Sequence, residues 1–104
     1  MTNPKTRRKT KMKNVFEIGK NYLIRTVTHI DVGKLIQVTD KELVITNASW
    51  IADTGRFMNC IKGGIESQSN SEIEPFPEKA NVIIGRGSII DMVEYNHKLP
   101  SIQK

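Results

Sequence analysis

The stretch VGKLIQVTDKELVITNA, residues 32–48, decides which fold we predict for this chain. Residues 34–39 and 43–46 are short, rich in apolar and β-branched side chains and bounded by polar residues, which is typical of strands. Residues 40–42, Asp-Lys-Glu, form the tight turn expected between them. Because so short a connection joins neighbouring strands, we predict that they pair antiparallel.

A further strand is predicted on the N-terminal side of this pair, over residues 22–30. Side chains alternate along it, so that Leu23 points to one face of the sheet and Tyr22 to the other. Residues 31–33, Asp-Val-Gly, are predicted to form a bend or turn before the next strand.

Two more strands are predicted near the C-terminus, over residues 82–84 and 88–95. Gly85 and Gly87 lie between them and permit a sharp bend or bulge. The chain from residue 14 to 96 is therefore predicted to be a single all-β domain, a strongly bent, partly closed, five-stranded small β-barrel.

The segment between the third and fourth predicted strands has a different pattern. Apolar residues at helical spacing predict a short helix over residues 53–63, with Asp53 as the N-cap acceptor for the free N–H groups at its start. Residues 64–80 are polar and predict a loop insertion, with Phe76 as its anchor in the core. The tail, residues 97–104, carries no clear element.

The excess of positive charge comes from the first 13 residues. This arm holds six basic residues and no acid, whereas the other 91 residues hold ten basic and eleven acidic side chains, a balance of −1. Such a segment cannot bury apolar area and is predicted to be disordered on its own. One interpretation is that the arm binds phosphate groups, with an affinity that falls as salt is added. The other is that the arm only keeps the protein soluble. The candidate nucleic-acid contacts in it are Lys5, Arg7, Arg8, Lys9, Lys11 and Lys13.

Composition restricts the remaining possibilities. A chain of 104 residues with 38% apolar side chains is one domain with one modest core. Its single cysteine, Cys60, cannot form an internal disulfide, and no apolar run approaches the length of a membrane span. We therefore expect a cytoplasmic protein with no membrane partner. His29 and His97 lack further ligands at metal-binding spacing, so neither a metal nor a cofactor is expected.

Residues 53–55, Asp-Thr-Gly, resemble the motif of the aspartic proteases. In the one-domain type of that enzyme, two subunits each supply one carboxylate, and the two carboxylates share a proton. Here Arg56 follows the motif in place of the usual Ala or Ser, and the segment after it predicts a helix and a loop where a flap hairpin is required. A dimeric aspartic protease using Asp53 is kept only as a residual hypothesis, and we expect no enzymatic activity.

Two segments resemble the paired motifs of the Sm-like family. In residues 32–48, Gly33 opens a strand, Asp40 follows seven residues later, and an apolar strand comes next. In residues 82–93, an apolar strand leads into Arg86 and Gly87 and then into a closing apolar strand. The resemblance implies a bent five-stranded barrel whose last two strands pair edge to edge with neighbouring subunits to form a ring.

The same resemblance implies a site for single-stranded RNA. In that family the turn containing the Asp and the Arg-Gly turn come together at the inner rim of the ring. Carried over to this chain, Asp40, Arg86 and Gly87 would form the rim, with Arg86 stacking on a base or holding a phosphate. The family pattern usually has an Asn soon after the Asp, whereas here Lys41 and Glu42 follow.

Two main hypotheses for function follow. The first is a homo-oligomeric, ring-forming domain that binds RNA or single-stranded DNA through the arm and the Arg-Gly turn. The second is a self-assembling structural or adaptor protein, including phage-associated ones, with no nucleic-acid role.

Overall fold

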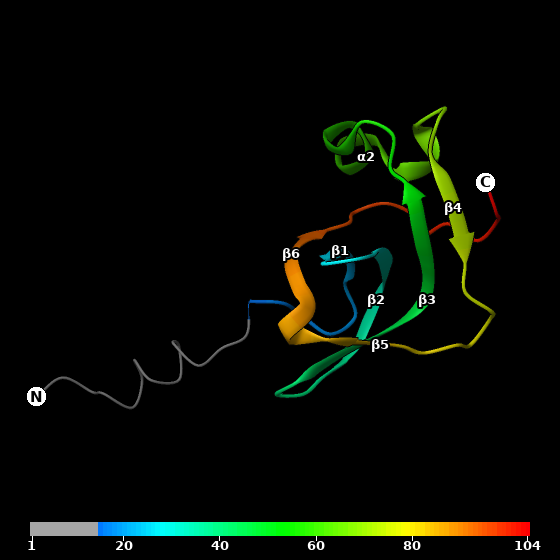
Figure 1. Cartoon of the computed structure of the whole chain (residues 1–104). Helices are drawn as coiled ribbons and strands as arrows, with labels where there is room; N and C mark the ends of the chain where they lie inside the picture. The colour runs from blue at the N-terminus through cyan, green and yellow to red at the C-terminus, as the bar shows by residue number, and fades with distance from the viewer. Residues whose placement is uncertain (1–14) are drawn as a thin grey trace, which may run out of the picture.

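The computed structural model describes residues 15–104 (Figure 1). The arm, residues 1–13, lies outside the described residues. The described chain folds into six β-strands and one short α-helix, with two single 3₁₀ turns at Ile65–Ser67 and Arg86–Ser88. In chain order the main elements are β1 (Asn21–Thr26), β2 (Ile30–Val38), β3 (Glu42–Asp53), α2 (Phe57–Gly63), β4 (Glu72–Pro75), β5 (Val82–Gly85) and β6 (Ile89–Glu94).

All six strands belong to one antiparallel sheet. Its strand order is β4-β3-β2-β1-β6, and β5 pairs with a separate part of β3. The all-β prediction and the antiparallel pairing are confirmed. The predicted strand count of five is wrong, and within residues 15–104 the sheet does not close into a barrel, because β5 pairs only with β3 and β6 only with β1.

Strand β3 pairs with two different strands, β5 and β4, along one of its edges. Residues 42–45 pair with β5, and the segment from Ser49 onward pairs with β4 (Figure 1). Between the two lies Asn47, which has a positive φ of 50°. The predicted strand over residues 43–46 is therefore too short. The predicted loop over residues 64–80 is also wrong in part, since it contains β4.

The predicted boundary between the first two strands is displaced. The turn lies at residues 27–29, inside the predicted strand over residues 22–30. Thr26 makes this turn, because its backbone N–H donates to the carbonyl oxygen of His29 at 2.8 Å and its Oγ1 accepts from the His29 N–H at 2.9 Å. Residues 31–33, predicted as a turn, instead lie within β2.

Gly33 lies where β2 crosses closest to β3. A Cβ at this position would lie 3.0 Å from the Cβ of Ala48, 3.0 Å from Cδ1 of Ile45 and 3.1 Å from the carbonyl oxygen of Thr46. These contacts are with buried side chains and backbone, so little space can be made for an added methyl group.

We expect Gly33→Ala to lower the free energy of unfolding by about 1 to 2 kcal/mol, because it overpacks the contact between β2 and β3. Equilibrium urea denaturation measures this change. Gly87→Ala is the control, since a Cβ at Gly87 meets no atom within 4 Å. Equal losses in the two variants would contradict the close approach at Gly33.

The sheet carries a buried cluster on each face, as the alternation along β1 predicts. The first cluster comprises Tyr22, Ile24, Leu35, Leu43, Ile45, Ala48 and Ile84. The second cluster comprises Leu23, Val32, Ile51, Cys60, Ile65, Ile73 and Tyr95. Helix α2 and the 3₁₀ turn after it contribute Cys60 and Ile65, so the insertion covers the second cluster. The prediction of a helix is confirmed, although it begins at Phe57.

Hydrogen bonds to buried groups hold the insertion and the tail on the second cluster. The Tyr95 hydroxyl accepts from the Ile65 backbone N–H at 2.9 Å, and His97 Nε2 lies 2.7 Å from the Ile61 carbonyl oxygen. The last residue, Lys104, exchanges two backbone hydrogen bonds with Ile73 of β4. The prediction of Phe76 as a core anchor is wrong, because 37% of this residue is exposed.

Candidate functional site

The structure brings the two turns of the Sm-like resemblance together. The backbone N–H of Arg86 donates to the Lys41 carbonyl oxygen at 2.8 Å, and Nη1 of Arg86 donates to the Thr39 carbonyl oxygen at 2.6 Å. Arg86 therefore lies against the turn that carries Asp40. Asp40 and Gly87 are both exposed beside it.

Arg86 is already engaged in contacts within the chain. Its guanidinium carbon lies 5.2 Å from the centre of the Phe16 ring, and the side chain is half-buried. Nη1 of Arg86 is thus used in a hydrogen bond to Thr39, and one face of its guanidinium group is covered by the Phe16 ring. RNA binding at Asp40, Arg86 and Gly87 stays a prediction, as does binding by the six basic residues of the arm, which lie outside the described residues.

Asp53, Thr54 and Gly55 form a local turn between β3 and α2. Oδ1 of Asp53 accepts the Gly55 N–H at 2.8 Å, and Gly55 has a φ of +69°. An Asp whose side chain binds the N–H two residues later is a common turn former, and glycine adopts positive φ without strain. The predicted bond from Asp53 to the Gly55 N–H is confirmed, but the predicted N-cap position is wrong, because Arg56 occupies it and makes no side-chain cap bond.

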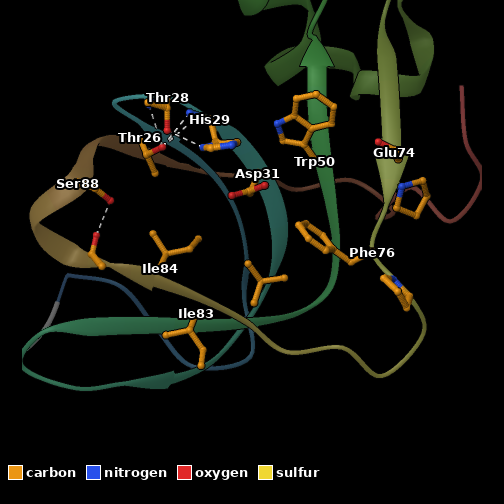
Figure 2. A pocket seen from close by; sticks show the side chains of 14 residues that line it. Thr26, Thr28, His29, Asp31, Trp50, Glu74, Phe76, Ile83, Ile84 and Ser88 are labelled. Atoms are coloured by element: carbon orange, nitrogen blue, oxygen red, sulfur yellow. Dashed lines mark hydrogen bonds between the residues drawn. The ribbon is translucent and has the colours of Figure 1, made fainter.

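A second site lies along β5, where a groove of about 660 Å³ opens between three segments of the chain (Figure 2). The turn between β1 and β2 forms one wall, and Trp50 of β3 with the segment after β4 forms another. Residues of β5 form the floor. The side chains used below are His29, Asp31, Trp50, Glu74, Phe76 and Ile83.

Asp31 is the central polar group of this groove. It pairs across the sheet with Ile24 on one side and Trp50 on the other, so it lies on the face of the first cluster. The residue is 7% exposed, and within residues 15–104 its carboxylate accepts no hydrogen bond. Burial raises the pKa of Asp31 above its ordinary value, and the charge of a nearby protonated His29 opposes that rise.

Aromatic side chains stand on both sides of the carboxylate. Figure 2 shows Asp31 between His29 and Trp50, and the centres of these two rings lie 6.4 Å apart at 61°. Phe76 lies on the same wall of the groove as Trp50 (Figure 2), positioned by a 2.9 Å hydrogen bond from its backbone N–H to the Ala48 carbonyl oxygen. Trp50 and Phe76 are each 37% exposed, so both rings present a face to the groove.

This arrangement is suited to binding a cation. The groove holds two carboxylates, Asp31 and Glu74, together with aromatic faces, and no described Lys or Arg lines it. Carboxylates and aromatic faces both attract cations. In residues 15–104, no group of three or more His, Cys, Asp or Glu side chains is placed to hold a metal ion.

This groove was not predicted from the sequence, for identifiable reasons. Asp31 was predicted in a turn, where an acid is ordinary, and not in a strand, where a buried acid is unusual. Tryptophan is highly buried on average, so Trp50 beside an apolar strand gives by itself no signal of a groove. The sequence signal that could have indicated the groove was the position of both Asp31 and Trp50, each next to an apolar strand segment.

No family model, curated protein or solved structure matches this chain. In the described part, no helix has the length and apolar character needed to cross a membrane.

Proposed function

We propose that this chain is a non-catalytic, Sm-like domain that assembles with copies of itself and binds RNA or single-stranded DNA. The observation that carries the proposal is that β5 and β6 each pair along one edge only within the described residues. Unpaired strand edges template pairing with another chain. An exposed isoleucine marks each strand, Ile83 at 68% and Ile90 at 64%.

The finer fold proposal is an open, Sm-like or SH3-like barrel that ring assembly completes. The two strands with free edges follow each other in sequence, separated only by the 3₁₀ turn Arg86–Ser88. Pairing β5 of one copy with β6 of the next would repeat around a ring and remove both edges. We place this assembly in the cytoplasm, consistent with a single, buried Cys60 that has no internal partner.

The nucleic-acid part of the proposal depends on charge. The arm carries six positive charges, whereas the rest of the chain is close to neutral. Neutralising about six phosphates of a single strand gives a salt slope of about −4, so binding should weaken roughly 300-fold from about 50 to about 200 mM salt. Asp40, Arg86 and Gly87 are the proposed rim contacts.

Light scattering after size exclusion tests assembly. We expect a particle several times the 11.8 kDa chain for the natural sequence, and the monomer mass for Ile90→Lys, because the added charge lies on a pairing edge. Met58→Lys is the control: Met58 is 65% exposed, close to the 64% of Ile90, but lies on α2. A monomer mass for the natural chain would contradict the proposed ring.

Fluorescence anisotropy with labelled oligouridine and oligothymidine tests nucleic-acid binding. Replacing Arg7 and Arg8 by Gln should make the salt slope shallower by about 1.4, the contribution of two phosphate contacts on a single strand. Absence of binding at low salt by the assembled particle would reject the nucleic-acid function.

One observation favours the alternative, a self-assembling structural or adaptor protein. Arg86 donates to Thr39 and lies over Phe16, so it is committed in part to holding the fold. A large particle that binds no oligonucleotide would support this alternative.

A further inference from the structure

Asp31 is an isolated acid in a strongly apolar setting. Its neighbours across the sheet are Ile24 and Trp50, and Ile84 of the first cluster lies in the floor of the same groove. The Asp31 residue is 93% buried, and its carboxylate oxygens reach the groove without accepting a hydrogen bond from the described residues, so holding the charge there is costly to the fold. Such a group is expected where a ligand supplies the missing partner.

The charges around Asp31 indicate the sign of that partner. The groove holds a second acid, Glu74, whereas no described Lys or Arg lines it. His29 is the one described basic group against Asp31, and its Nδ1 lies 2.6 Å from Oγ1 of Thr28. Two carboxylates would repel a phosphate group, so nucleic acid is a poor occupant and a cation is a good one.

The aromatic residues beside Asp31 indicate which kind of cation the groove would bind. Trp50 and Phe76 offer ring faces beside the carboxylate, and a planar guanidinium or an ammonium binds favourably over such faces. A guanidinium in addition donates two hydrogen bonds to one carboxylate. A small free amine would leave Phe76 and the exposed Ile83 uncovered, whereas apolar residues next to a basic residue in a peptide would cover them.

We propose that this groove binds an extended segment of a partner protein through one Arg or Lys side chain. The basic group would lie against Asp31 between Trp50 and Phe76, and an adjacent apolar residue would lie on Ile83. This inference is independent of nucleic-acid binding, because it uses neither the arm nor the turn of Arg86. It shares β5 and Ile83 with the proposed assembly.

Trp50 is the only tryptophan, so its fluorescence reports directly on the groove. The probe is a capped pentapeptide, Pro-Leu-Arg-Pro-Leu, titrated into the full chain. We expect a saturable change in Trp50 emission, and binding weaker by about tenfold or more when citrulline, a neutral analogue of similar shape, replaces the arginine. No saturable change with the arginine probe, or equal affinity for both probes, would overturn the proposal.

Two matched variants locate the binding group. Asp31→Asn should weaken the arginine probe by about tenfold or more while keeping the shape of the side chain. Glu72→Gln removes the same charge from an exposed position on β4 outside this groove and should leave affinity unchanged. Unchanged binding in Asp31→Asn would overturn the proposal. Circular dichroism confirms that both variants are folded.

Other occupants are distinguished by two further titrations. A peptide of residues 1–14 represents the arm of a second copy, and ethylguanidinium represents a small free cation. If either bound more tightly than the apolar-flanked arginine probe, the proposal of a separate protein partner would be overturned in favour of that occupant. Weaker binding of both supports it.

Discussion

Replacing Tyr95 by Ala is expected to lower the free energy of unfolding by about 3 to 5 kcal/mol, and replacing it by Phe by about 1 to 3 kcal/mol. Tyr95 is 1% exposed and lies in the second cluster, so the Ala variant leaves a large cavity. The Phe variant keeps the ring but removes the acceptor of the Ile65 N–H, a buried donor. Equilibrium denaturation measures both changes.

Tyr22→Phe is the matched control for the hydroxyl. The Tyr22 hydroxyl also accepts a backbone N–H, that of Glu17, at 2.8 Å. Because Glu17 is exposed, water can replace this acceptor, and we expect a loss below about 1 kcal/mol. Equal losses in Tyr22→Phe and Tyr95→Phe would contradict the anchoring role of the buried bond. Hydrogen exchange should show faster opening of α2 in Tyr95→Phe.

The parts of the fold that local signals determine were predictable from sequence. The turn at residues 40–42 was expected from polar residues between two β-branched runs, and β2 and β3 end and begin at Val38 and Glu42. The alternation along β1 correctly separated Tyr22 from Leu23, which belong to different clusters. These features require no knowledge of distant residues.

Strand β4 could not be predicted in the same way. Of its four residues only Ile73 is buried, and it ends in Pro75, within a polar segment that reads as a loop. The strand forms because the second half of β3 offers it an edge, and a single sequence does not reveal such distant pairing. The early end predicted for β3 has the same cause, since Asn47 and Ser49 read as loop residues until β4 is placed beside them.

The sequence predicted that the turns of Asp40 and Arg86 are adjacent, but it did not predict the groove around Asp31. The resemblance brought the turns of Asp40 and Arg86 together, and they are adjacent in the structure. The groove was missed because it depends on which face of the sheet Asp31 occupies. That face follows from the register between Asp31 and Trp50, which the bulges between β2 and β3 set. Asp and Gly so near each other favoured a turn prediction at residues 31–33.

Asp31→Asn is expected to raise the free energy of unfolding by about 1 to 3 kcal/mol at neutral pH, because it removes a partly desolvated charge that accepts no hydrogen bond from the described residues and keeps the side-chain volume. A binding group held at a cost to stability is a familiar feature of functional sites. Thermal and urea denaturation of the variant beside the natural chain measure the gain. A loss of stability would mean that the carboxylate has a structural partner.

The pH dependence of this gain follows from the raised pKa of Asp31. Below its unfolded value of 3.8 the carboxyl is protonated in both states, and natural and variant chains should differ little. As pH rises from that value through the raised folded value, the folded state holds more protons than the unfolded state, so the natural chain loses stability. Above the folded value the difference levels off.

Titrating groups that do not interact with Asp31 contribute equally in both chains and cancel in the comparison. His29 and Glu74 are the ionisable neighbours in the groove, and His29 when protonated favours the Asp31 carboxylate. The gain measured at about pH 7 should therefore exceed that at about pH 3.5. A gain that did not change with pH would show that Asp31 ionises in the folded chain as readily as in the unfolded one. The groove would then lack the desolvated charge on which cation binding depends.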